Sequence, residues 1–274
     1  MRRNYHETVL TNLPFGVRFY TSEVETSGYV PLHWHSSLEL LCVYEGELTL
    51  HIDSREHHVG PGQFIVVSSG LLHDVANTPN RAIVLQVPMK SMQFFEPHPE
   101  RLQFNAEKPA PRAAYKAVLE QAKRMARLIE KQLPGYLYDV GSSYLTILKI
   151  LTVCFCEETP LAPSANETIK NVLSYVGEHY AEKLTVDELA GVAGYNGNYL
   201  SRLFHETTGK TLISYIYEVR LTHFYEGLVR TETDIGQLME QNGLKNQRTA
   251  REMFLKLYGE RPLAVRKRHR ANGH

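Results

Sequence analysis

Two histidines and a glutamate lie close together near the N-terminus, at His33, His35 and Glu39, and another histidine follows at His73. In an extended strand, side chains separated by an even number of positions lie on one face. Two imidazoles and a carboxylate can therefore converge, and His73 can join them from another strand. Such a set can bind Zn, Ni, Fe or Mn, or it can line a metal-free pocket for a small molecule. The sequence leaves both alternatives open.

The residues around this cluster are typical of short strands separated by turns. Residues 48–52 alternate in polarity, and residues 64–67 and 82–87 are rich in apolar and β-branched side chains. This spacing over residues 5–105 predicts a small β-barrel or sandwich. Trp34, the only tryptophan of the chain, falls on the face opposite to the neighbouring histidines, so we expect it to pack rather than to stack on a ligand.

Two helical patterns follow, at residues 113–133 and 136–157, with a Pro-Gly break between them. They predict an antiparallel helical pair that packs on the barrel. Residues 159–166 contain two prolines and few large apolar side chains, which is typical of an exposed linker. We therefore expect an α+β protein of two domains, an N-terminal domain at 1–158 and an all-α C-terminal domain at 167–274.

The C-terminal region contains two matched units, at residues 185–209 and 234–259. Each unit has a helical pattern, a glycine turn, and a second helical pattern that ends in phenylalanine before a glycine stop. Thr185 and Glu188 form a capping box at the start of the first unit, and Asp234 begins the second. Two helices joined by a tight turn predict a helix-turn-helix, whose second helix enters the DNA major groove.

Helical spacing also predicts which side chains of the second helices face outward. In the first unit the expected buried face is Tyr199, Leu200, Leu203 and Phe204. The outward-facing candidates for DNA contact are, in the first unit, Asn198, Ser201, Arg202 and His205, and in the second unit, Gln247, Arg248, Thr249 and Arg251.

The last hundred residues or so resemble the DNA-binding domain of AraC/XylS-family transcription regulators. The resemblance is carried by residues 199–204 (Tyr-Leu-Ser-Arg-Leu-Phe), Gly209, Arg220, Leu221, Gly243, Phe254, Gly259 and Pro262. It implies that one long helix, here residues 212–229, joins the two units. The side chains of that helix expected to face the core are Ile213, Ile216, Val219 and Phe224.

The N-terminal cluster resembles the two cupin motifs. The first motif is matched by His33, His35, Glu39 and Gly46, and the second by Gly62, Gly70, His73 and Asn77, with Ser68 where the pattern usually has proline. The resemblance implies a jelly-roll sensor domain. The helical pair of this chain resembles the element through which two copies of a cupin-type AraC regulator form a homodimer.

Composition adds few constraints. Net charge is zero over the whole chain, but residues 166–274 contain 15 Lys and Arg against 13 Asp and Glu, a net charge of +2. Residues 251–270 contain seven of these basic side chains, which could contact phosphates or form a solvated tail. Three cysteines and no signal-like or membrane-spanning apolar run favour the reducing cytoplasm and no membrane.

We therefore expect a ligand-responsive, sequence-specific DNA-binding transcription regulator that acts as a homodimer. The family implies an activator of a metabolic operon, with a carbohydrate operon favoured. The partners it implies are double-stranded DNA, RNA polymerase and a small-molecule effector such as a sugar. The sequence has no nucleophile motif and predicts no catalytic residue. The alternative is a metal-dependent cupin enzyme with a helical appendage.

Overall fold

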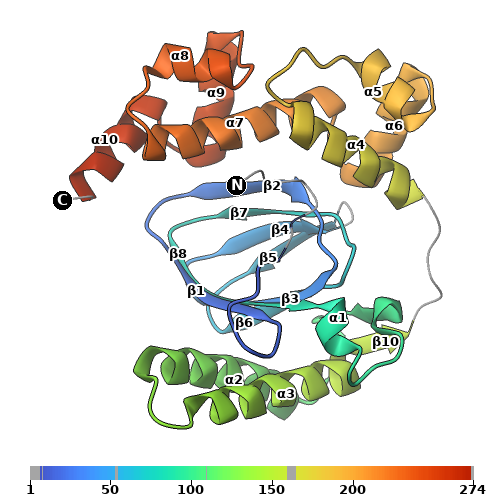
Figure 1. Cartoon of the computed structure of the whole chain (residues 1–274), viewed down its shortest axis with the longest axis vertical. Coiled ribbons are helices and arrows are strands. Elements are labelled where there is room, and N and C mark those ends of the chain that lie inside the picture. The colour runs from blue at the N-terminus through green and yellow to red at the C-terminus, as the bar shows by residue number, and fades with distance from the viewer. Residues whose placement is uncertain (1–6, 8, 53–54, 109, 159–164, 273–274) are drawn as a thin grey trace.

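The computed structural model describes residue 7 and residues 9–52, 55–108, 110–158 and 165–272. Two β-sheets lie at the centre of the molecule, a helical pair covers one side of them, and a second helical domain lies on the opposite side (Figure 1). This arrangement confirms the expected α+β fold, with an N-terminal β-domain and an all-α C-terminal domain.

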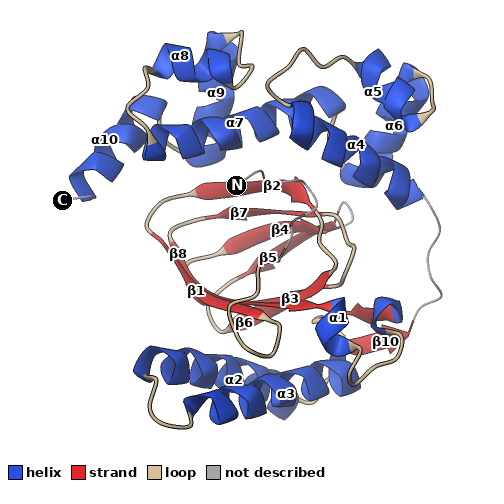
Figure 2. Ribbon diagram, in the orientation of Figure 1, coloured by secondary structure: helices blue, strands red, loops and turns tan. Residues whose placement is uncertain are grey.

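The β-domain consists of two antiparallel four-stranded sheets (Figure 2). The first has the order β1 (Arg18–Val24), β8 (Asn80–Pro88), β3 (Ser37–Glu45) and β6 (Gln63–Val67). The second has the order β2 (Gly28–His33), β7 (His73–Asn77), β4 (Leu48–Ile52) and β5 (Arg55–Val59). The strands expected at 48–52, 64–67 and 82–87 are confirmed as β4, β6 and β8.

Strand β3 is buried on both faces, which is why its sequence is apolar without alternation. Leu38, Leu40 and Cys42 point toward the helical pair, whereas Leu41 and Val43 point into the space between the sheets. Glu39 has the same parity as Leu41 and Val43 and therefore faces the interior of the barrel. A carboxylate in that position requires a partner, because burial of an unpaired charge is costly.

The expected helical pair is present as α2 (Arg112–Lys131) and α3 (Tyr136–Phe155). It packs on the outer face of the first sheet through one continuous core. Within the described part of the chain, α3 is the one helix long and apolar enough to cross a membrane. Its buried residues, which include Val140, Ile147 and Leu151, belong to that core, and this packing accounts for its apolar composition.

Short elements connect the β-domain to the helical pair and to the chain beyond it. The helices α1 (Met89–Met92) and η1 (Pro99–Arg101) precede β9 (Leu102–Phe104), which pairs with β10 (Cys156–Glu158) after α3. Of the linker expected at 159–166, residues 159–164 lie outside the described residues, and 165 and 166 already begin the next helix.

The C-terminal domain contains seven helices in the described residues. They are α4 (Ala165–His179), α5 (Val186–Ala193), α6 (Gly197–Thr208), α7 (Leu212–Arg230), α8 (Ile235–Gln241), α9 (Gln247–Tyr258) and α10 (Pro262–Asn272). The long α7 contributes Tyr215 and Val219 to one core and Phe224 and Leu228 to another. It therefore joins two separately packed helix-turn-helix units, as the resemblance implied.

Two burial predictions were wrong. Tyr199 is 37% exposed and packs against the ring of Tyr195 on the surface, because Leu200 takes the buried position of that turn. Ile213 is 48% exposed, because the buried face of α7 begins with Leu212 and continues at Tyr215.

Candidate DNA-binding helices and effector pocket

The second helices of the two units, α6 and α9, have matching ends. Asn196 and Asn246 cap their first turns by accepting hydrogen bonds from the backbone nitrogens three residues later. Each helix ends at a left-handed glycine, Gly209 with φ 72° and Gly259 with φ 70°, where a residue without Cβ is favoured. The capping hydrogen bond from the backbone of Glu188 to Thr185 Oγ1, expected from the sequence, is also present.

The predicted DNA-contacting side chains of α6 lie on its outer face. Asn198, Arg202 and His205 are exposed, and Ser201 is half-buried. The Arg202 side chain is 69% exposed and lies 4.0 Å from a carboxylate oxygen of Glu206. Such a surface pair holds the guanidinium only weakly, so Arg202 can reach an external acceptor.

The corresponding side chains of α9 are more basic and are already engaged with each other. Arg248 Nε lies 3.1 Å from Glu252 Oε1, and Arg251 donates to Gln247 Oε1 at 3.2 Å. Both arginines are exposed, while Gln247 and Thr249 are half-buried. The second unit therefore presents two guanidinium groups and one carboxylate at the places where the first unit presents Asn198, Ser201 and Arg202.

The basic residues near the C-terminus do not form a solvated tail throughout. They lie on α10, which packs against α7 and α9. Arg266 is buried, Arg268 pairs with Glu260 at 3.4 Å, and Arg270 pairs with Glu232. These contacts place Arg266, Arg268 and Arg270 on the second unit and leave Lys267 as an exposed cation of this helix.

The histidine cluster forms at a corner between the two sheets. His33 ends β2 and is the cross-strand neighbour of His73 on β7. His35 lies between β2 and β3, and Glu39 belongs to β3 in the other sheet. The expectation that positions 33, 35 and 39 share one face of a single strand was therefore wrong, although the four side chains do converge. The available ring nitrogens of the three histidines lie within 4.8 Å of one another.

Each imidazole is oriented by a backbone carbonyl. The Nδ1 atoms of His33, His35 and His73 lie 2.8, 3.0 and 3.1 Å from the carbonyl oxygens of Pro31, Ser37 and Leu71. In each case the acceptor is two residues away, so the backbone sets the ring orientation. A neutral imidazole carries one N–H, and here Nδ1 provides it. The Nε2 lone pairs are consequently left for the pocket, which is the usual arrangement in metal-binding histidines.

Two of the three Nε2 atoms, those of His35 and His73, face the carboxylate of Glu39. His35 Nε2 and His73 Nε2 lie 3.2 and 3.3 Å from Glu39 Oε2, and His73 Nε2 is buried without a hydrogen-bond partner. With neutral rings, these contacts would place lone pairs against lone pairs. A cation between them, either a proton or a metal ion, removes that repulsion. The donor set therefore fits a divalent metal.

Burial and neighbouring charges perturb the titration of this cluster. Burial, together with the charges of His73 and His35, holds the pKa of His33 well below its usual value. Burial opposes the charged form of His35 as well, but the hydrogen bond and charge of Glu39 outweigh it, and the pKa of His35 is raised. Burial would raise the pKa of Glu39, yet its histidine partners hold that pKa well below the usual range.

Residues that the sequence did not predict surround the cluster. Gln86 on β8 donates to Glu39 Oε1 at 3.2 Å and to Glu7 Oε2 at 3.0 Å. Arg18 donates to Glu7 at 2.9 Å, and Glu7 Oε2 lies 3.9 Å from His33 Nε2. The sequence carried no signal for these contacts, because none of the three residues belongs to a recognisable motif.

Comparisons with known proteins agree with this geometry. A helix-turn-helix domain family matches residues 189–268, and a cupin domain family matches residues 20–87. Regulatory protein SoxS of Escherichia coli (strain K12) is 30% identical over 105 residues, which cover 38% of this chain and 98% of SoxS. The chain belongs to the AraC/XylS family of transcription regulators.

Longer matches extend over both domains of this AraC-family regulator. The HTH-type transcriptional regulator YdeC of Bacillus subtilis (strain 168) is 22% identical over 275 residues, which cover 96% of this chain and 94% of YdeC. The crystal structure of an apo ToxT variant from Vibrio cholerae has a TM-score of 0.53 and 10% identity, and covers 93% of this chain and 98% of that chain. The protein is therefore a DNA-binding transcription regulator with a cupin domain.

In this AraC-family regulator, strand β2, which carries His33 of the histidine cluster, also packs against the DNA-binding domain. Leu32 and Leu72 lie in the core of the first helix-turn-helix unit, and Tyr29 packs against the second. Trp34 packs there as expected, with Lys170 Nζ 4.4 Å from its ring centroid. Its packing partner is the DNA-binding domain, which the sequence did not predict.

Proposed function

We propose that this protein is a ligand-responsive, sequence-specific DNA-binding regulator whose cupin pocket binds a divalent metal. The metal ligands would be His33, His35, His73 and Glu39. One observation carries the proposal, namely that three imidazoles held by backbone carbonyls bring their available ring nitrogens within 4.8 Å of one another, with two of them beside the buried carboxylate of Glu39. A bound metal would supply a Lewis-acidic centre for an anionic or polyhydroxy effector.

The metal proposal is tested by elemental analysis of the tag-free protein. We expect about one metal per chain in the wild type and none in the His35→Ala/His73→Ala double variant. Substrate turnover by the metal-loaded protein would instead favour the cupin-enzyme alternative. Retained metal in a folded double variant would place the site elsewhere.

Two observations support direct base readout by both recognition helices. The outer faces of α6 and α9 present the polar and basic side chains Asn198, Ser201, Arg202 and His205, and Gln247, Arg248, Thr249 and Arg251. One helix, α7, links the two units. We propose that the helices enter successive major grooves about 10 base pairs apart. A footprint that protects only one groove segment would contradict this.

The family supports three finer parts of the proposal. The protein would act in the cytoplasm as an activator that contacts RNA polymerase, and its effector would be a metabolite, with a sugar favoured. A reporter fused to the target promoter distinguishes activation from repression. Deletion of the gene should lower reporter output if the protein is an activator.

The homodimer would form through α2 and α3. The outer face of α3 exposes Tyr138, Leu145 and Val153, and beside it lies a groove of about 320 Å³ between α1 and α3. We expect Leu145→Glu to convert a dimer into a monomer in analytical ultracentrifugation. A dimer that survives this change would have another interface.

A further inference from the structure

The residue that follows the glycine at the end of each recognition helix forms an ion pair with a residue eight positions later. In the first unit, Lys210 Nζ lies 3.0 Å from Glu218 Oε2. In the second unit, Glu260 Oε2 lies 3.4 Å from Arg268 Nε. The two pairs occupy equivalent places directly after Gly209 and Gly259, but their polarity is reversed. In each unit the cation of the pair reaches the β-domain, Lys210 at Asp74 and Arg268 at Thr26.

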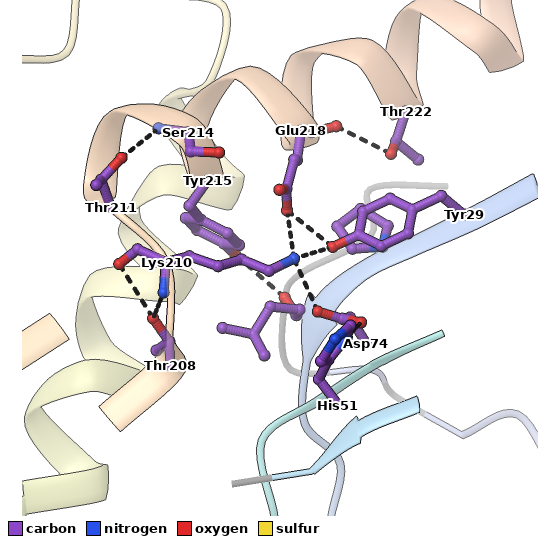
Figure 3. Close-up of polar contacts among 12 residues, drawn as sticks. Tyr29, His51, Asp74, Thr208, Lys210, Thr211, Ser214, Tyr215, Glu218 and Thr222 are labelled. Carbon is purple, nitrogen blue, oxygen red and sulfur yellow. Dashed lines mark hydrogen bonds and ion pairs between the residues drawn. The ribbon is translucent and has the colours of Figure 1, made fainter. Parts of the chain in front are cut away.

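The first of these pairs is completed by the β-domain. Lys210 Nζ lies 2.8 Å from Asp74 Oδ2 of β7 and also contacts the hydroxyl group of Tyr29 on β2 (Figure 3). The Tyr29 hydroxyl donates to Glu218 at 2.8 Å. The side chains of Lys210, Asp74 and Glu218 are 18%, 0% and 9% exposed. Lys210 is therefore shielded from solvent between two carboxylates of different domains.

This cluster depends on Lys210 for its charge balance. The ammonium group faces the carboxylates of Asp74 and Glu218, and His51 Nδ1 lies 2.8 Å from Asp74 on the other side. Loss of the lysine charge would leave two buried carboxylates near each other without their shared cation, which is strongly unfavourable. In contrast, the Glu260–Arg268 pair is more exposed and reaches the β-domain through a hydrogen bond from Arg268 to Thr26.

The strands that hold Lys210, β2 and β7, also carry His33 and His73 of the histidine cluster. Successive residues of a strand point to opposite faces, so His73 points into the pocket and Asp74 points toward the DNA-binding domain. Strand β2 carries Tyr29 at the interface and, beyond a register shift between Val30 and His33, it carries His33 in the histidine cluster. A shift of either strand at the pocket therefore moves a group that contacts Lys210.

We infer that Lys210 is the positioning residue that couples the cupin pocket to the first recognition helix. It lies between the end of α6 and the start of α7, so its contacts with Asp74 and Tyr29 join β2 and β7 to both helices. Filling of the pocket changes the placement of these strands, and the Lys210 contacts transmit the change to α6. The identity of the pocket ligand rests on the proposed function, whereas the docking role of Lys210 does not.

The test compares full-length Lys210→Met with Glu260→Gln, its equivalent in the second unit. The duplex is one selected by the wild type from a random pool, and the probe is Zn²⁺ alone against a chelator. We expect zinc to change the DNA dissociation constant of the wild type and of Glu260→Gln by at least about 5-fold, within the usual range of coupling between sites. In Lys210→Met the change should fall below about 2-fold while zinc still binds. An unchanged zinc effect in this variant would overturn the inference.

Hydrogen exchange separates failure of this inference from failure of the metal proposal. If the wild type binds no zinc, the metal proposal fails, and the docking role of Lys210 is then judged without it. Amides of β2 and of the first turns of α7 should exchange at least about 10-fold faster in Lys210→Met than in the wild type and in Glu260→Gln, because local opening sets exchange. Equal exchange in all three proteins would overturn the inference.

A second variant guards against misfolding of the first. Asp74→Asn removes the same ion pair from the β-domain and leaves every residue of the helical domain unchanged. It should reproduce both the loss of the zinc effect and the faster exchange, with a far-ultraviolet circular dichroism spectrum like that of the wild type. A folded Asp74→Asn protein that behaves as the wild type does in both measurements would overturn the inference.

Discussion

Replacement of Arg202 by alanine tests whether the first recognition helix reads bases. The side chain is 69% exposed and lies 4.0 Å from Glu206, a surface pair that contributes about 0–1 kcal/mol. Its removal should therefore change the free energy of unfolding by less than about 0.5 kcal/mol. A loss of DNA binding in this variant then reports a lost DNA contact rather than partial unfolding.

The expected size of that loss follows from the geometry of guanine recognition. A bidentate arginine–guanine contact discriminates by about 1–3 kcal/mol, which corresponds to an increase of roughly 5- to 150-fold in the dissociation constant of the selected site. Non-specific binding depends on phosphate contacts, so binding to a shuffled duplex should weaken much less. The salt dependence of binding should stay unchanged.

Fluorescence anisotropy with the selected and the shuffled duplex, at several salt concentrations, measures both quantities. The control is Glu206→Ala, which removes the neighbouring carboxylate and should leave binding equal or tighter. Equal losses on both duplexes, with a salt slope reduced by about 0.9, would show that Arg202 contacts only phosphate. The proposed role of Arg202 in base readout would then be wrong.

Three other predictions concern the second unit, the pocket and the barrel. Glu252→Ala should tighten non-specific DNA binding and loosen base preference in the same assay, because it removes a carboxylate and frees Arg248. An intact footprint with unchanged affinity would show that α9 is mainly a packing element. Zinc affinity, measured by competition with a chelator, should fall as pH drops through about 6.5, because ligating histidines must be neutral. The raised pKa of His35 means that this loss of affinity begins at a higher pH. Gly46→Ala should lower the melting temperature more than Gly62→Ala does. Both glycines have positive φ, but a Cβ at Gly46 would lie 1.9 Å from a backbone oxygen whereas one at Gly62 meets nothing within 4 Å.

Local patterns predicted most elements because burial of one face and capping of one end are local properties. The alternation of residues 48–52 matches the burial of β4, and Thr185 caps the helix that it was expected to start. The same reasoning was wrong at Tyr199, because a large aromatic ring at helical spacing can also lie on the surface against another ring.

The composition of the pocket was predictable, but its geometry was not. The spacing of His33, His35 and Glu39 identified the cluster, whereas the structure places His33 and Glu39 in different sheets and His35 between them. Pairing of β2 with β7, and of β3 with β8, decides where each strand ends. Such pairing is long-range and leaves no signal in the short motif.

The interface between the domains was also absent from the sequence patterns. Lys210 follows a helix-ending glycine, where an exposed lysine is ordinary, and Asp74 is only the neighbour of a motif histidine. Their contact at 2.8 Å arises when the second sheet packs on α7. A buried ion pair between two distant segments becomes visible only when both partners are placed in space.

The unequal charges of the recognition helices explain how a chain of zero net charge can bind DNA. Phosphate attraction depends on local charge, and α9 exposes Arg248, Arg251 and Lys256. Helix α6 offers Arg202 and shorter polar groups that can fit base edges, with no further Lys or Arg. Each exposed arginine of α9 has a hydrogen-bond partner one turn away at 3.1 or 3.2 Å, whereas Arg202 of α6 lies 4.0 Å from Glu206. We therefore expect the salt dependence of binding to come chiefly from the second unit and the base preference chiefly from the first.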